Sequence, residues 1–182
     1  KGRVAIVTGG GRGIGKAIAI RLAEEGVHVV VASTSLEPAV QVVKEVEARG
    51  CKGLAIQTDV SKFDDVKRAV AKTIEQFGQI DILVNNAGGS ARGKMSLFCD
   101  SEEDTWDYVL GTNLKGVFYT CRQVIGHMLN NGKGSIINIG SVLGFLPMPY
   151  MALYSATKHA VAGYSESLDH ESRTQGIRVS VV

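Results

Sequence analysis

Thr8-Gly9-Gly10-Gly11-Arg12-Gly13-Ile14-Gly15-Lys16-Ala17 follows a short run of β-branched residues and leads into a segment with helical spacing. Five glycines within seven residues let the backbone turn tightly and approach a bound group closely. The helix expected to begin near Ile14 offers free amide groups and the positive end of its dipole at the same point. This stretch therefore predicts an anion site, of the kind that holds the phosphates of a nucleotide.

Two nucleotide-binding motifs compete for this glycine-rich stretch. The sequence Gly10-x-x-x-x-Gly15-Lys16 matches all but the end of a P-loop, which would make the protein an NTPase. Ala17 stands where that motif needs a hydroxyl to hold magnesium, so the P-loop is the weaker alternative. The strict dinucleotide motif Gly-x-Gly-x-x-Gly is absent in every register, and what remains is Thr-Gly-x-x-x-Gly-x-Gly over residues 8–15.

Strand-like and helix-like segments alternate along the whole chain. Runs rich in β-branched residues predict strands at Val4-Thr8, Val27-Ala32, Gly53-Val60, Ile80-Val84, Ser135-Ile139 and Ile177-Val182. Helical spacing predicts helices at Ile14-Glu25, Glu37-Arg49, Phe63-Phe77, Glu103-Leu129 and Tyr154-Thr174. Gly26 and Gly50 stand just past two of these helices, and Ser61 is placed to cap the third. The alternation predicts one α/β domain over residues 1–182, a Rossmann-type doubly wound parallel sheet with helices on both faces.

The composition is that of an ordinary globular protein, with 182 residues, 45% hydrophobic and 21% charged. A net charge of +2 without a basic stripe argues against a nucleic-acid partner, and the apolar runs are too short for a membrane span. Three widely separated cysteines form no Cys-x-x-Cys, which indicates reduced thiols and a cytoplasmic protein. The four histidines lack metal-ligand spacing, so no metal site is expected.

Further motifs occur in a fixed order after the glycine-rich stretch. They are Asp59-Val60, Asn85-Asn86-Ala87-Gly88, Asn113, Ser141 and Tyr154-x-x-x-Lys158. Tyr154 and Lys158 are four residues apart, so within a helix both side chains leave from one face. Together with the glycine spacing, this order resembles the short-chain dehydrogenase/reductase family over essentially the whole chain.

The resemblance implies a role for each of these residues. Tyr154 would be the general acid and base, and Lys158 would bind the nicotinamide ribose and favour the phenolate. Ser141 would hydrogen-bond the substrate oxygen, and Asn113 would hold a water in a proton relay behind Lys158. The implied cofactor-binding residues are Gly9, Gly11, Arg12, Gly13, Ile14, Gly15, Ser33, Thr34, Asp59, Val60, Asn85, Asn86, Ala87, Gly88, Tyr154 and Lys158, with Asn86 pinning backbone.

The residues alone leave plainer alternatives open. Ser141 could be a turn at a strand end, and Asp59 could cap the helix that follows. Asn113 could be a hydrogen bonder inside its helix, and Asn85 and Asn86 could be turn residues.

The residues after the second predicted strand indicate NADP, with NAD as the alternative. An NAD site typically has an acidic side chain about 20 residues beyond the glycine loop, bonded to the ribose 2′-hydroxyl. This chain reads Ala32-Ser33-Thr34-Ser35 there, so no carboxylate would repel a 2′-phosphate, and Arg12 could pair with it. If Arg12 is simply solvated, the enzyme would accept both cofactors.

The segment from Val142 to Met151 is largely apolar and stands between Ser141 and Tyr154. As a pocket wall it would suit a small apolar ketone or secondary alcohol, and core packing explains the composition equally well. Arg12 with the Ser/Thr cluster resembles the NADP-dependent 3-oxoacyl-carrier-protein reductases of the family. Residues 165–171 are instead similar to the hydroxysteroid-type branch, and few basic residues stand where the reductases dock their carrier protein.

The expected function is hydride transfer between NADP(H) and a carbonyl or secondary alcohol, with Tyr154 as general acid and base. A dinucleotide-binding sensor or scaffold without catalysis is the alternative. The resemblance implies a homodimer or homotetramer built on the helices at residues 103–129 and 154–174. It also implies a Pro-Gly loop, a substrate-covering helix and a last strand beyond Val182, so a sheet without its closing strand and a pocket without its lid are expected.

Overall fold

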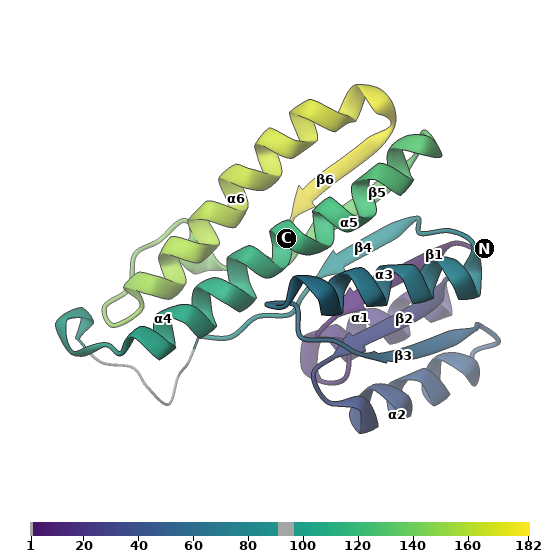
Figure 1. Cartoon of the computed structure of the whole chain (residues 1–182), viewed down its shortest axis with the longest axis horizontal. Helices are drawn as coiled ribbons and strands as arrows, with labels where there is room; N and C mark the ends of the chain where they lie inside the picture. The colour runs from purple at the N-terminus through teal and green to yellow at the C-terminus, as the bar shows by residue number, and fades with distance from the viewer. Residues whose placement is uncertain (1, 91–96) are drawn as a thin grey trace.

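The computed structural model describes residues 2–90 and 97–182, and its centre is a six-stranded parallel sheet (Figure 1). The strands are β1 (Val4–Thr8), β2 (His28–Ser33), β3 (Gly53–Gln57), β4 (Ile82–Asn85), β5 (Gly134–Asn138) and β6 (Ile177–Val181). Their order is β3-β2-β1-β4-β5-β6. The predicted doubly wound sheet is confirmed, and its switch point lies at the carboxyl ends of β1 and β4.

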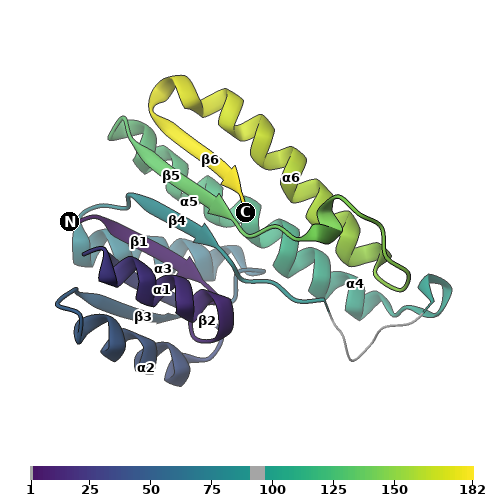
Figure 2. The ribbon, with the colours of Figure 1, turned by 180° about the vertical axis from the view of Figure 1, so that it is seen from behind.

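Helices cover both faces of the sheet. They are α1 (Gly13–Glu24), α2 (Leu36–Glu47), α3 (Phe63–Phe77), α4 (Glu103–Leu110), α5 (Gly116–Asn130) and α6 (Ala152–Ser172). One core joins the sheet to α1 and α2, and the other joins it to α3, α5 and α6; Figure 2 shows α1 in front of the sheet and α3 and α5 behind it. None of the described helices combines the length and the apolar character that crossing a bilayer requires.

The period of two residues in a strand explains why β1 is apolar up to its last residue, Thr8. In β1, Ala5 and Val7 belong to the core under α1 and α2, whereas Val4 and Ile6 belong to the core under α3, α5 and α6. A strand buried on both faces has no solvent side on which to place polar residues. The first polar side chains therefore come where the strands end, which is where the candidate site lies.

The turn after β3 differs from its prediction. The strand ends at Gln57, before the predicted end at Val60, because Asp59 Oδ1 accepts hydrogen bonds from the backbone amide and the hydroxyl of Ser61 (3.0 and 2.6 Å). The prediction that Ser61 caps α3 is wrong, since the N-cap residue is Lys62. The predicted helix ends at Gly26 and Gly50 are confirmed, because both glycines adopt the left-handed region (φ 77° and 78°).

The long helix predicted over residues 103–129 is interrupted. A π-helical turn, Gly111–Lys115, separates α4 from α5 and contains the buried Asn113. Such turns widen the helix locally and often occur at functional sites. Nothing in the helical spacing of the sequence distinguishes this turn from the regular helix around it.

We expect Asp169→Asn to destabilise the protein at neutral pH and to matter less in acid. Asp169 lies buried on α6, where its carboxylate accepts from the Val179 amide of β6 (2.8 Å) and pairs with Arg173. These partners lower the pKa of Asp169 to about 2, the Val179 amide contributing most. Because the folded pKa lies below the unfolded one, this stabilisation is present above about pH 4 and is lost as the pH falls through about 2.

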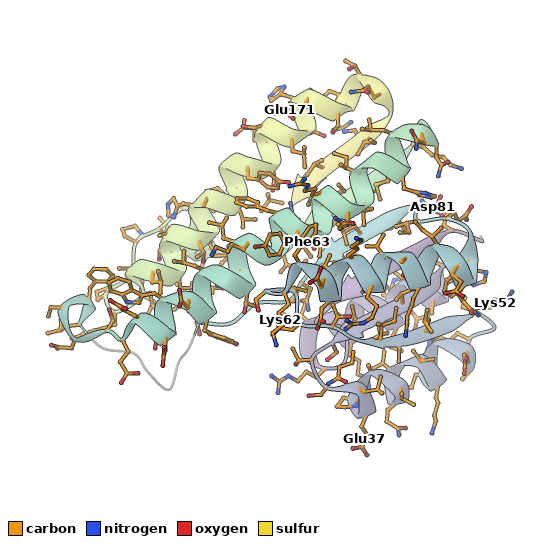
Figure 3. The ribbon with its side chains drawn as sticks, viewed as in Figure 1. Glu37, Lys52, Lys62, Phe63, Asp81 and Glu171 are labelled. Atoms are coloured by element: carbon orange, nitrogen blue, oxygen red, sulfur yellow. The ribbon has the colours of Figure 1, made fainter. Side chains whose placement is uncertain are left out.

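Urea unfolding of the wild-type protein and Asp169→Asn at several pH values measures this effect. Glu171→Gln is the matched control, because Glu171 projects from the outer side of the same helix (Figure 3). The expected difference between wild type and Asp169→Asn shrinks toward pH 2, and a difference that stays constant with pH would contradict the account.

Candidate active site

The end of β4 holds the glycine loop that follows β1. Gly9 adopts φ 64°, and Asn86 donates from Nδ2 to the backbone oxygens of Thr8 (3.0 Å) and Gly9 (3.3 Å). In return, Thr8 Oγ1 accepts from the backbone amides of Asn86 (3.1 Å) and Ala87 (3.0 Å). Asn86 therefore pins backbone, and the two strand ends at the switch point are tied together.

The inner side of the glycine loop has no room for a side chain, whereas its outer side is open. A Cβ at Gly15 would lie 2.5 Å from Asn86 Nδ2 and closer still to the carbonyl oxygen of Gly9. At Gly13, where φ is 54°, a Cβ would meet open space, so a ligand can approach the backbone there. A loop packed on one side and open on the other is what a phosphate cradle at a helix N-terminus requires.

Lys16 does not serve the glycine loop. Its Nζ lies 2.7 Å from Glu45 Oε1, so the ammonium group is drawn toward α2. A P-loop lysine has to reach the β- and γ-phosphates of the bound nucleotide. Because Ala17 also lacks the hydroxyl that magnesium needs, the geometry disfavours the NTPase alternative.

A cleft of about 470 Å³ lies beside the glycine loop. The predicted cofactor residues that line it are Gly9, Arg12, Gly13, Ile14, Ser33, Thr34, Asp59, Val60, Asn86, Ala87 and Gly88. Gly11 and Gly15 are buried outside this lining, and Tyr154 and Lys158 lie on α6. The cradle, the polar rim and the cationic Arg12 fit the phosphates and adenosine of a dinucleotide.

Asn85 does not line this cleft, although it was predicted among the cofactor-binding residues. It is buried at the end of β4, donates from Nδ2 to Asn138 Oδ1 of β5 (2.8 Å) and accepts at Oδ1 from Thr120 of α5 (2.7 Å). Asn138 in turn donates to Ser165 of α6 (2.7 Å). The side chain of Asn85 therefore ties two strands to two helices beneath the site.

Four residues of the cleft lining were not predicted: Thr58, Ser61, Tyr108 and Thr112. Tyr108 extends from α4 over residues 86–90, which follow β4 and are called the β4 loop here, and its hydroxyl would lie 2.5 Å from a Cβ at Gly89. Tyr108 and Thr112 are four residues apart, so the helical period that groups Tyr154 with Lys158 could have grouped them too. The sequence alone does not show that the face of α4 that carries Tyr108 points toward the cleft.

The rim of the cleft near Arg12 is cationic and hydroxyl-rich. Arg12 is exposed, and within the described residues its guanidinium has no ion pair or hydrogen bond. Ser33 and Thr34 line the same cleft, and neither of them carries a carboxylate. Asp59, the acidic residue in the lining, is engaged by Ser61. A phosphate monoester at this rim would meet the Arg12 guanidinium and hydroxyl donors.

Tyr154 and Lys158 share one face of α6, as predicted. Lys158 Nζ lies 5.7 Å from the centroid of the Tyr154 ring and donates to the backbone oxygen of Ile139 (2.6 Å). Lys158 is buried, and this burial lowers its pKa from the ordinary lysine value. The hydrogen bond to Ile139 fixes the ammonium group beside the ring of Tyr154.

Asn113 joins the β4 loop to α6. Its Oδ1 accepts from the Gly89 amide and its Nδ2 donates to the Gly89 carbonyl, both over 2.9 Å. Nδ2 also lies 3.2 Å from Thr157 Oγ1, which donates to the Tyr154 carbonyl (2.7 Å). The side-chain amide is thus engaged with protein groups, and any water relay would have to use another atom of Asn113.

Ser141 stands at the end of β5 and caps a short 3₁₀ turn, Val142–Gly144. Its Oγ accepts from the Leu143 amide over 3.2 Å. Among the described residues Ser141 donates to no acceptor, so its hydroxyl hydrogen is free to bond a ligand oxygen. The turn and the ligand-binding interpretation are therefore compatible in this geometry.

A second cavity, of about 310 Å³, reaches Tyr154 and is lined mostly by apolar atoms. Its lining comes from the end of the β4 loop, from residues 97–109 and from residues 149–154. Figure 1 shows α4 and the start of α6 extending together beyond the carboxyl ends of the strands. The two cavities meet the same β4 loop, the cofactor cleft at Gly88 and the apolar cavity at Ser90.

Only the end of the segment predicted as a pocket wall lines the cavity. Pro149, Tyr150 and Met151 line the cavity, whereas Phe145 and Leu146 are exposed and lie outside the lining. Core packing does not explain the segment either, because Val142 to Tyr150 is mostly at the surface. The remaining wall is formed by residues 97–109, which sequence reasoning had not assigned to the substrate.

Comparison with known proteins agrees with this geometry. A family model described as short chain dehydrogenase matches residues 3–182. The chain is 43% identical over 179 residues to a 3-oxoacyl-[acyl-carrier-protein] reductase of Staphylococcus epidermidis, a match that covers 98% of this chain and 72% of that protein. A metagenomic short-chain oxidoreductase solved in complex with NADP matches with a TM-score of 0.95 and 32% identity, over 100% of this chain and 81% of the other. A 3-ketoacyl-(acyl-carrier-protein) reductase from Brucella melitensis, complexed with NADH, gives a TM-score of 0.93 and 34% identity, over 100% and 74%. The chain therefore belongs to the short-chain dehydrogenase family.

Proposed function

We propose that the protein is an oxidoreductase that transfers a hydride between NADP(H) and a carbonyl or secondary alcohol. The observation that carries this proposal is the position of Tyr154 and Lys158, which lie together where the apolar cavity reaches α6. The cofactor cleft borders the same β4 loop. A bound nicotinamide would supply or accept the hydride.

The chain's own residues would handle the oxygen of the substrate. In the reducing direction Tyr154 gives its hydroxyl proton to the carbonyl oxygen, which becomes the alcohol oxygen. The hydroxyl of Ser141 donates a hydrogen bond to the same oxygen and stabilises the negative charge that develops there. The Ile139 carbonyl fixes the ammonium group of Lys158, which stabilises the negative charge on the Tyr154 oxygen after the proton has left. Asn113 holds the β4 loop against α6 while this happens.

Arg12, Ser33 and Thr34 support NADP as the cofactor, with NAD accepted more weakly. We expect Arg12→Ala to weaken NADPH binding about ten- to hundred-fold, because a hydrogen bond to a charged group contributes about 1.5–3 kcal/mol. NADH, which lacks the 2′-phosphate, should bind the variant and the wild type alike.

Fluorescence titration of both reduced dinucleotides into wild type and Arg12→Ala measures this preference. Arg21→Ala is the control, because Arg21 lies on α1, the helix that Arg12 precedes as N-cap residue, but pairs with Glu24 and Glu25. An equal loss of NADPH and NADH affinity in Arg12→Ala would show that Arg12 does not read the 2′-phosphate.

We further propose a substrate class, a cellular compartment and an oligomeric state for the enzyme. The substrate is a small apolar molecule, because the cavity at Tyr154 is mostly apolar. The three cysteines are free, and two of them are buried, in keeping with a reducing cytoplasm. A homodimer or homotetramer would use the exposed faces of α4, α5 and α6.

Oxidation of NADPH by a panel of ketones, followed by absorbance, tests the function as a whole. The proposal expects turnover that depends on the ketone. Dinucleotide binding without turnover on any carbonyl would favour the sensor or scaffold alternative.

A further inference from the structure

Aromatic side chains gather around the apolar cavity. Phe98 and Trp106 both line it, with ring centroids 5.3 Å apart and ring planes 7° from parallel. The indole Nε1 of Trp106 donates to Ser101 Oγ over 2.8 Å, which fixes the orientation of the ring. Tyr150 also lines the cavity, which ends at Tyr154. The cavity is therefore bounded by flat, oriented rings rather than by aliphatic side chains alone.

Tyr150 keeps an unfavourable backbone conformation. Its φ is 62°, and across the described ranges 2–90 and 97–182 it is the one non-glycine residue with a positive φ. A bulky residue is disfavoured in the left-handed region, where glycine is not. The side chain is 60% exposed, so burial in the core does not compensate for this cost. Strain of this kind, beside a candidate catalytic residue, points to a functional role for the ring.

We propose that the substrate is a compact aromatic ketone, or the matching alcohol, whose ring packs against Trp106, Phe98 and Tyr150. This inference rests on the proposed function and specifies its substrate class. Offset or edge contacts between aromatic rings stabilise a flat ligand beyond the area that it buries. The cavity of about 310 Å³ has room for one or two fused rings.

The test compares three ketones that differ in shape and aromaticity: 1-tetralone, its saturated analogue 1-decalone, and linear 2-decanone. Turnover is measured with NADPH, and binding is measured separately by calorimetry. Trp106 is the single tryptophan of the chain, so its fluorescence, corrected with free tryptophan amide for absorption by the ligand, reports binding at this wall. We expect kcat/KM and affinity for 1-tetralone to exceed those for the other two at least about ten-fold.

Tyr150→Gly separates the proposed role from ordinary packing. Glycine adopts φ 62° without cost, so the variant should unfold at higher urea concentration while its preference for 1-tetralone falls. Phe145→Leu is the matched control, because Phe145 is exposed in the same segment outside the cavity lining. It should leave the preference unchanged. A Tyr150→Gly variant that keeps the full preference would overturn the role of Tyr150.

The outcomes distinguish this inference from the proposed function. If 1-tetralone binds and changes the Trp106 fluorescence but no ketone is reduced, the preference for an aromatic ligand stands and the enzyme function fails. If all three ketones are reduced with similar kcat/KM, the function stands and the aromatic class fails. If the ketones neither bind nor react, both are wrong.

Discussion

Tyr154→Phe is expected to reduce turnover about 10²- to 10⁴-fold, the usual contribution of a positioned general acid. The substitution removes one oxygen and keeps the ring beside Lys158 and in the wall of the apolar cavity. Dinucleotide affinity should therefore stay the same. Steady-state rates with a ketone and NADPH, together with a direct titration of NADPH, separate the two quantities.

Tyr119→Phe is the matched control for this loss. Tyr119 lies on α5, where its ring meets Phe63 edge to face with centroids 5.4 Å apart, and it lines neither cavity. It loses the same hydroxyl from a place without a role in the proposed chemistry. Equal rates in wild type and Tyr154→Phe would remove Tyr154 from the proton-transfer step.

Gly15→Ala should abolish dinucleotide binding at concentrations that saturate the wild type. The new Cβ would collide with Asn86 Nδ2 and the carbonyl oxygen of Gly9. Neither atom can move away without breaking the hydrogen bonds that join the ends of β1 and β4. The glycine loop would have to open, and its amides would no longer point at the phosphates. Calorimetric titration with NADPH measures the loss, and circular dichroism checks that the variant is folded.

Gly126→Ala provides the control for adding a methyl group. Gly126 is an exposed position in α5 where a Cβ meets nothing within 4 Å. Alanine there should stabilise the protein by about 0.5–1 kcal/mol, because glycine is a poor helix former, and leave NADPH binding intact. Normal binding by Gly15→Ala would show that the loop is not packed as described.

The sequence predicts the features that depend on local chemistry. The glycine cradle, the six strands and the Tyr154 and Lys158 pair follow from conformational freedom, burial pattern and helical period. Asn85 was predicted among the cofactor-binding residues, and the strand period indicates that its side chain does not face the cleft. Leu83 belongs to the core under α3, α5 and α6, and two residues later Asn85 faces the same way, away from the cleft.

Other features depend on how distant segments meet. The π-helical turn at Asn113 leaves no mark on helical spacing, because it is set by contacts with Gly89 and Thr157. The number of residues between Val142 and Met151 that line the cavity depends on where the chain turns back before α6. Composition gives the apolar character of Phe145 and Tyr150 equally, but the tertiary structure leaves Phe145 outside the cavity and places Tyr150 in its wall.

Transfer of deuterium from NADPH that carries two deuterium atoms at nicotinamide C4 tests the central claim most directly. The product alcohol of a reactive ketone is analysed by mass spectrometry. The account predicts that the carbon bearing the new hydroxyl gains one deuterium with wild-type protein and that Tyr154→Phe forms almost none of this product. Bound NADPH with no deuterium in any product would contradict it.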